Sequence, residues 1–108
     1  MKTIINTNNA PAPIGPYSQA VKAGNMLFVS GQIAIVPATG ELDLSTIENE
    51  THQVMKNIGA ILKEARADYS DIIKTGIFLK DMNQFAAVNS VYGSYFTSDF
   101  PARETVQV

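Results

Sequence analysis

Few residues in this chain could carry out chemistry, and the clearest candidate is an arginine close to the last residue. In the closing segment FPARETVQV, Arg103 shares one face of an expected strand with Thr105 and Gln107, whereas Glu104 and two valines share the other. A planar guanidinium can grip a small carboxylate through two parallel hydrogen bonds. Arg103 is therefore either a surface arginine in an ordinary ion pair or the carboxylate-binding group of a pocket.

Three other polar candidates lie where apolar residues would be expected. Ser30, Gly31 and Gln32 interrupt the apolar runs MLFV and IAIV. This interruption indicates either a β-bulge, with the serine satisfied by the backbone, or a binding site. Asn89 lies on the apolar side of an expected helix, as a satisfied amide or as a ligand contact. Tyr17 begins an expected strand and could place its ring in the core with its hydroxyl at the rim.

Several kinds of site have no support in the sequence. The chain has no cysteine, which excludes disulfides, thiolate nucleophiles and zinc–thiolate sites. Its one histidine, His52, lies on the flank of an expected helix, where we expect it to be solvated. One histidine without cysteine does not predict a metal site, and no phosphate-binding glycine motif is present. We therefore expect neither a metal ion nor an organic cofactor.

The first half of the chain is expected to supply three strands and one helix. The opening KTIIN is β-prone, and the loop NTNNAPAPIGP follows it. Strands are expected at Tyr17–Lys22 and Met26–Ile35, joined by a tight turn at Gly24-Asn25. Ser45 and Glu48 have the spacing of a capping box, and apolar residues then recur every three or four positions as far as Ala65.

The second half is expected to alternate strand and helix. DIIKTGIFLK has the two-residue period of a strand. Asp81, with Gln84 three residues later, can cap a helix whose apolar side includes Phe85, Val88, Asn89 and Tyr92. The order β-ββ-α-β-α-β predicts an α+β fold with a mixed sheet and both helices packed on one face. The other face of the sheet then needs cover, which a trimeric ring would supply.

Length and charge limit the classes of protein further. With 108 residues, 45% of them hydrophobic, we expect a single domain spanning 1–108. The net charge is −2 and no basic stripe is present, so nucleic acid is not an expected partner. The N-terminal segment has no apolar stretch typical of a signal peptide or membrane span. We therefore expect a cytoplasmic protein without membrane contact.

Three separated stretches resemble one known family. IGPYSQAVKAGNMLFVSGQI, IIKTGIFLKDMNQFAAVNSVYGSYF and FPARETVQV are similar, in order and spacing, to the RidA (YjgF) family of reactive intermediate deaminases. The resemblance implies a chorismate-mutase-like fold and a homotrimer with ligand clefts between subunits. It also implies hydrolysis of enamines and imines such as 2-aminoacrylate to 2-keto acids and ammonia, without a cofactor.

The resemblance also assigns roles to individual residues. Arg103 matches the arginine that binds the substrate carboxylate, and Thr105 matches a position that contributes its backbone. The residues matching the catalytic positions are Arg103, Tyr17 and Ser30, and those matching substrate-binding positions are Arg103, Gly31, Asn89 and Thr105. Many members carry cysteine at the position of Thr105. Because this chain has threonine there and no cysteine elsewhere, thiol chemistry is excluded.

The chain departs from the family pattern in two respects. Members usually carry a glycine where this chain has Arg66, and a left-handed arginine there would cost about 1 kcal/mol. Relatives also continue past the VQV-type strand into one last strand with an acidic residue thought to orient water. This sequence ends at Val108, so we expect the last family strand to be absent and the strand Arg103–Val108 to lack its neighbour.

Two functions from different classes are consistent with this inventory. The first is an imine deaminase acting on 2-aminoacrylate, 2-iminopropanoate or 2-iminobutanoate. The alternative is a non-catalytic regulatory module that binds a 2-keto acid or another small carboxylate in the same cleft. Ribonuclease activity fits poorly with the acidic charge balance.

Overall fold

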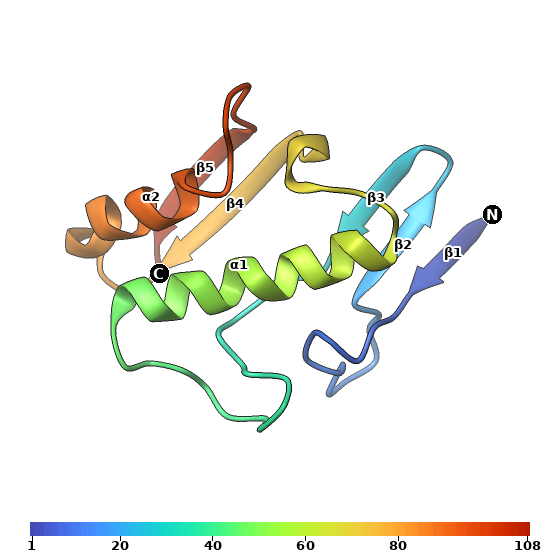
Figure 1. Ribbon diagram of the computed structural model, residues 1–108, viewed down its shortest axis with the longest axis horizontal. Coiled ribbons are helices and arrows are strands. Elements are labelled where there is room, and N and C mark those ends of the chain that lie inside the picture. The colour runs from blue at the N-terminus through green and yellow to red at the C-terminus, as the bar shows by residue number, and fades with distance from the viewer.

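The elements follow each other in the predicted order, and the α+β class is confirmed (Figure 1). The computed structural model describes every residue from 1 to 108. The elements are β1 (Lys2–Ile5), β2 (Ala20–Ala23), β3 (Met26–Val29), α1 (Ile47–Glu64), the 3₁₀ turn η1 (Tyr69–Asp71), β4 (Lys74–Leu79), the 3₁₀ turn η2 (Met82–Gln84), α2 (Phe85–Gly93) and β5 (Ala102–Gln107). None of the helices is both long and apolar enough to cross a membrane.

The strands form two sheets rather than one continuous sheet. Strands β1, β2 and β3 are antiparallel neighbours, and β2 turns into β3 at the predicted position, with Gly24 at a φ of 60°. Strands β4 and β5 form a separate parallel pair in which Thr75 lies opposite Arg103 and Ile77 opposite Thr105. β4 pairs with β5 along its whole length on one side. The other edge of β5 has no partner strand in this chain, which agrees with the expectation of an unpaired edge.

Three predicted strands are shorter than expected. β2 begins at Ala20 rather than Tyr17, and β3 ends at Val29 rather than Ile35. After Val29 the Ser30 amide bonds to the Gln19 carbonyl at 3.0 Å, and the chain then leaves the ladder. Of the predicted strand residues before Lys74, Asp71 belongs to the 3₁₀ turn η1, which Asp68 caps, and Ile72 and Ile73 lie in no regular element.

The first helix is capped one residue later than the sequence predicts. The Thr46 hydroxyl, not that of Ser45, accepts a hydrogen bond from the Asn49 amide at 3.0 Å. The Ser45 hydroxyl instead donates to Asp43 at 2.6 Å. The predicted Ser45–Glu48 capping box is therefore wrong, because Thr46 accepts from the helix backbone and the Ser45 oxygen accepts only from the Asn49 side chain, at 3.1 Å.

The end of α1 keeps the left-handed conformation that usually favours glycine. Arg66 has a φ of 61°, and its amide bonds to the Lys63 carbonyl at 3.0 Å. The next amide, of Ala67, reaches back to Leu62 at 2.8 Å, which completes a Schellman motif. We expect the side chain at Arg66 to cost about 1 kcal/mol relative to glycine.

The second helix is preceded by a turn that Asp81 caps. The Asp81 carboxylate accepts from the Asn83 amide at 2.9 Å, and a 3₁₀ turn runs as far as Gln84 before α2 begins at Phe85. Asp81 therefore caps as predicted, but it caps the turn η2 rather than the α-helix.

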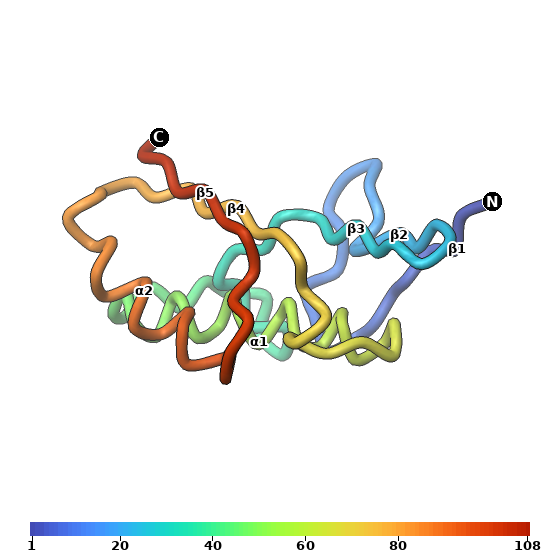
Figure 2. Tube along the Cα trace, turned by 90° about the horizontal axis from the view of Figure 1, so that it is seen from above, coloured from blue at the N-terminus to red at the C-terminus, as the bar shows by residue number.

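Both helices cover the same face of the strands, as predicted (Figure 2). The fully buried Ile61 of α1 packs with Ala10 and Ala20. A second cluster joins α1 to α2 through Met55, Tyr92 and Phe96. The core is thus the layer between the helices and the inner faces of the two sheets.

Two buried amides hold the irregular segments near the ends of β2 and β3. Gln19 accepts from the Thr7 amide at 2.7 Å and donates to the carbonyls of Thr7, Ala10 and Pro11. Asn57 of α1 donates to the carbonyls of Ile33 and Ile35 at 3.2 and 2.9 Å. These side chains replace the sheet hydrogen bonds that the loops lack. They therefore fix the segments that carry Tyr17 and Ser30.

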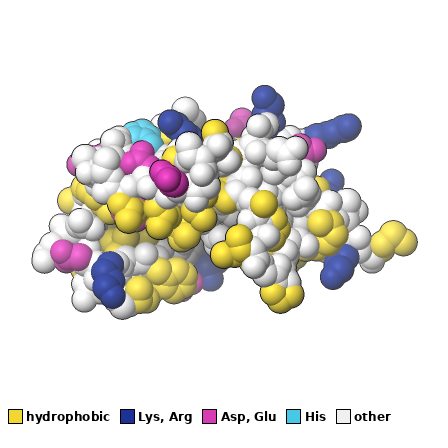
Figure 3. Space-filling view, turned by 90° about the horizontal axis from the view of Figure 1, so that it is seen from below, with side chains coloured by type: hydrophobic (Ala, Val, Ile, Leu, Met, Phe, Trp, Pro, Cys, Tyr) yellow, Lys and Arg dark blue, Asp and Glu magenta, His cyan; other side chains and the backbone are white.

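The outer face of the strands is left uncovered by this chain. Phe28 of β3 and Phe78 of β4 are 60% and 70% exposed, and Met26 and Val106 are also open to solvent. In the space-filling view, hydrophobic side chains reach the surface in several groups with charged side chains between them (Figure 3). A single copy therefore leaves large apolar side chains in water, which is unfavourable.

Candidate functional site

Arg103 is held between β5 and α2 by three side chains of that helix. Its Nη1 donates to Oδ1 of Asn89 at 2.7 Å. The carbon at the centre of its guanidinium lies 5.4 Å from the ring centre of Phe85 and 5.1 Å from that of Tyr92. Both distances are within the range of cation–π attraction. The arginine is thus held in position by contacts within its own chain.

The helix can supply these contacts because of its periodicity. Phe85, Asn89 and Tyr92 are spaced by four and three residues, which aligns them on one face of α2. The same spacing predicted a common side for them from the sequence. What the sequence did not indicate is that this side faces Arg103 as well as the core.

The charge of Arg103 has no acidic partner in this chain. The only ion pair joins Lys74 to Glu104 at 3.8 Å, and both side chains are exposed. Glu104 alternates with Arg103 along β5 and therefore lies on the other face of the strand. The reading of Arg103 as part of an ordinary ion pair is therefore wrong. Asn89 is a neutral acceptor, so the positive charge and the remaining N–H groups stay available to an anion.

Thr105 lies two residues beyond Arg103 on the same face of β5. Its hydroxyl oxygen is buried and makes no hydrogen bond within the chain. A buried hydroxyl without a partner costs about 1–3 kcal/mol. Thr105 therefore presents an unsatisfied group beside the arginine.

Tyr17, Ser30 and Gly31 form a second group at the ends of β2 and β3. The Ser30 hydroxyl donates to the carbonyl of Ser18 at 2.6 Å, so its single proton is engaged and only its lone pairs remain free. Gly31 is exposed, and a side chain there would meet no atom within 4 Å. Tyr17 is 51% exposed. The hydrogen bond from Ser30 to the Ser18 carbonyl confirms that the backbone satisfies the serine hydroxyl.

The predicted site residues thus fall into two groups in one chain. Arg103, Asn89 and Thr105 belong to the β4–β5 sheet and to α2, whereas the second group lies in the segments just before β2 and just after β3. The structure brings Arg103 and Asn89 into contact, and no hydrogen bond joins the two groups.

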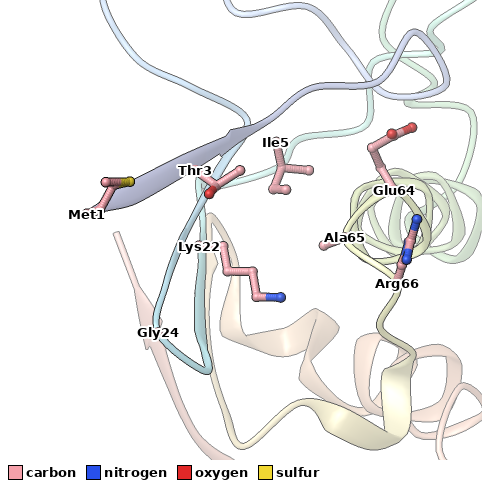
Figure 4. Close-up of a pocket in the computed structure, with 8 residues that line it drawn as sticks. All are labelled: Met1, Thr3, Ile5, Lys22, Gly24, Glu64, Ala65 and Arg66. Carbon is pink, nitrogen blue, oxygen red and sulfur yellow. The ribbon is translucent and has the colours of Figure 1, made fainter.

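Two surface hollows lie away from these residues. One, of about 370 Å³, is formed between the paired strands β1 and β2 and the end of α1 (Figure 4). Lys22 projects into it from β2, and Glu64 and Arg66 line its helical side. The other, of about 330 Å³, lies beside Tyr69. Neither hollow is lined by a predicted site residue, and no cluster of three or more potential metal ligands is present.

His52 is half-buried, and its ring takes part in an aromatic cluster with Tyr95, so the expected solvation is only partial. Its Nδ1 lies 2.8 Å from the Tyr95 hydroxyl, and the ring of Tyr95 lies 5.2 Å from that of Tyr69. Burial raises the pKa of Tyr69 to about 12, with a further contribution from Tyr95. Burial also raises the pKa of Tyr95. The histidine therefore joins α1 to the turn that follows α2 rather than forming part of the Arg103 group.

With this geometry established, the chain can be compared with known proteins. Residues 7–108 match the model of the family described as Endoribonuclease L-PSP. The chain belongs to this family, which is the RidA (YjgF) family. The resemblance noted in the sequence is therefore confirmed.

Three members of the RidA family illustrate the degree of similarity. A RutC family protein from Pyrococcus horikoshii is 55% identical over 108 residues, covering all of this chain and 86% of that protein. Reactive Intermediate Deaminase A, chloroplastic, from Arabidopsis thaliana is 48% identical over 107 residues, and the match covers 99% of this chain and 57% of that protein. The crystal structure of Escherichia coli TdcF with bound serine is 40% identical, with a TM-score of 0.94 over 98% of this chain and 85% of that one.

Proposed function

We propose that this RidA family member hydrolyses reactive enamines and imines, among them 2-aminoacrylate, 2-iminopropanoate and 2-iminobutanoate, to 2-keto acids and ammonia. The observation that carries the proposal is the guanidinium of Arg103, which has no acidic partner and is oriented by the neutral Asn89. Two relatives support it: one is named as a reactive intermediate deaminase, and another holds serine, an amino acid with a carboxylate.

The reaction requires little machinery beyond positioning. The substrate carboxylate binds the free N–H groups of Arg103, which fixes the imine carbon relative to the protein. Water adds to that carbon, a proton passes to nitrogen, and the C–N bond of the resulting carbinolamine breaks to release ammonia and the keto acid. Tyr17 is the proposed proton donor, and Ser30, whose own proton is engaged, acts as an acceptor that orients water.

The proposal requires more than one copy of the chain. One group of site residues lies on β5 and α2 and the other beside the β1–β3 sheet, and the apolar outer face of the two sheets is open. We propose a homotrimer in which each cleft combines the Arg103 group of one subunit with the Tyr17 group of its neighbour. Such an arrangement buries Phe28 and Phe78 as well. The cytoplasm is the proposed location.

Substitution of Arg103 tests the assignment directly. We expect Arg103→Ala to abolish keto-acid formation when the protein is coupled to a threonine or serine dehydratase, which releases the imine. Arg103→Lys should recover little, because an ammonium group lacks the planar fork. The matched control is Lys74→Ala, which removes an exposed cation from β4 and should leave the rate unchanged. Full activity in Arg103→Ala would exclude the assignment.

One observation favours a second function without catalysis. The only proton of the Ser30 hydroxyl is committed to the Ser18 carbonyl, so Tyr17 alone is left as the proposed proton donor. A regulatory module that binds a 2-keto acid through Arg103 needs no proton donor. It is distinguished by an Arg103-dependent dissociation constant for 2-oxobutanoate in a protein that does not accelerate imine hydrolysis.

A further inference from the structure

The hydroxyl of Tyr92 makes a contact that the core does not require. The ring of Tyr92 packs with Met55 and with Phe96, whose ring centre is 5.0 Å away, and a phenylalanine could make the same contacts. The side chain is nevertheless a tyrosine that is only 7% exposed, and its buried hydroxyl must find a partner. It finds one in Thr75, at 2.8 Å between the two oxygen atoms.

The partner of this hydroxyl lies directly beside the arginine of the site. Thr75 of β4 is paired with Arg103 of β5 in the parallel ladder. The ring of Tyr92 is in turn 5.1 Å from the guanidinium. The hydrogen bond therefore links Tyr92, whose ring packs on the guanidinium of Arg103, to Thr75, the residue opposite Arg103 on β4. Rotation or sliding of α2 relative to β4 and β5 would break this link.

We propose that Thr75 and Tyr92 are positioning residues that fix the guanidinium of Arg103 for carboxylate binding. This inference rests on the proposed function of Arg103. The Asn89 amide oxygen accepts a hydrogen bond from one edge of the guanidinium. The Tyr92 ring packs against the guanidinium and sets its distance from α2. Without the Thr75–Tyr92 hydrogen bond, the Tyr92 ring and the Arg103 side chain can shift together. The free N–H groups of the arginine then lose their alignment with a planar carboxylate.

A second tyrosine provides a matched control, which shows whether loss of a tyrosine hydroxyl acts only by lowering stability. Tyr95, three residues later in the turn that follows α2, also ties this part of the chain to another element through its hydroxyl, which lies 2.8 Å from Nδ1 of His52 on α1. The aromatic rings that lie against the guanidinium of Arg103 are those of Phe85 and Tyr92, not that of Tyr95. Tyr92→Phe and Tyr95→Phe thus remove comparable hydrogen bonds from α2 and from the turn directly after it, and only the first concerns the arginine.

The test measures ligand binding separately from catalysis and from stability. The dissociation constant of 2-oxobutanoate is determined by isothermal titration for wild type, Tyr92→Phe, Thr75→Val, the double variant and Tyr95→Phe. KM and kcat come from the dehydratase-coupled assay, and thermal unfolding is followed for each protein. We expect Tyr92→Phe and Thr75→Val each to weaken binding by about three- to tenfold. KM should rise by a similar factor, kcat should change less, and the double variant should be no weaker than the singles.

The controls separate failure of this inference from failure of the proposed function. Tyr95→Phe should lower the unfolding temperature and leave the dissociation constant within twofold of wild type. Equal weakening in Tyr95→Phe and Tyr92→Phe would show a general effect of helix stability and overturn the inference. So would wild-type binding in Tyr92→Phe, provided that Arg103→Ala abolishes binding. If Arg103→Ala binds 2-oxobutanoate as wild type does, the carboxylate site itself is wrong.

Discussion

A negative charge at position 89 should weaken substrate binding without unfolding the protein. In Asn89→Asp a carboxylate replaces the amide oxygen that accepts from Arg103 at 2.7 Å. The new carboxylate keeps that hydrogen bond and adds an ion pair, so we expect the free energy of unfolding to stay the same or to rise slightly. The arginine, however, is then neutralised before the substrate arrives.

The size of the effect follows from the geometry. The substrate carboxylate binds the opposite edge of the guanidinium, roughly 7 Å from the carboxylate of the variant. At an effective dielectric constant of about 20, two unit charges at that separation repel by about 2.4 kcal/mol. This corresponds to a loss of roughly fiftyfold in affinity for 2-oxobutanoate. Added salt should reduce the loss, because screening acts on the same repulsion.

The assay is titration of 2-oxobutanoate into each variant, with KM from the coupled reaction as a second measure. Ser90→Asp is the control, because it adds the same charge at the next, exposed position of α2 and should change binding by less than twofold. Wild-type affinity in Asn89→Asp would refute the view that the uncompensated charge of Arg103 drives binding. Equal weakening in both variants would assign the effect to net charge.

Three further outcomes are expected. Thr105→Val removes a buried hydroxyl that has no partner, so it should raise the free energy of unfolding in urea by about 1 kcal/mol and leave activity within tenfold of wild type; a larger loss would show that the hydroxyl takes part. The pKa of Tyr69 is raised from 10.0 to about 12, so folding favours the protonated phenol. The free energy of unfolding should therefore fall as the pH rises from 10 towards 12. In Tyr69→Phe that fall should be smaller, and an unchanged pH profile contradicts the assignment. Phe78→Asp places a charge on the open outer face and should dissociate the proposed trimer, so light scattering that still reports a trimer argues against burial of that face.

Regular periodicity explains how much of the fold could be predicted. The three- and four-residue spacing along α1 and the alternation in β4 both specify their elements, since one face of each must be buried. The ends of elements depend on competing side chains. Thr46 caps α1, whereas the neighbouring Ser45 hydroxyl bonds to the side chains of Asp43 and Asn49, and spacing alone does not distinguish these two hydroxyls.

The candidate site was predictable only in part. Arg103 and Asn89 could be identified from the family pattern, but their mutual hydrogen bond depends on how α2 crosses the β4–β5 pair. Gln19 and Asn57 carried no local signal, because their partners are backbone groups of residues up to 24 positions away. Long-range partners of buried amides follow from the tertiary structure rather than from the pattern of neighbouring residues.

The division into two sheets has a consequence for how the molecule opens. Arg103, Asn89, Tyr92 and Thr75 all belong to the continuous segment 74–107, in which a strand, a helix and a parallel strand contact one another. Segments of this kind commonly open and close as one cooperative unit in hydrogen exchange. The amides of the β1–β3 sheet can therefore lose their protection from hydrogen exchange while the segment that holds Arg103 stays folded. On this basis, we expect brief local opening of the β1–β3 sheet to expose backbone amides without releasing the guanidinium of Arg103.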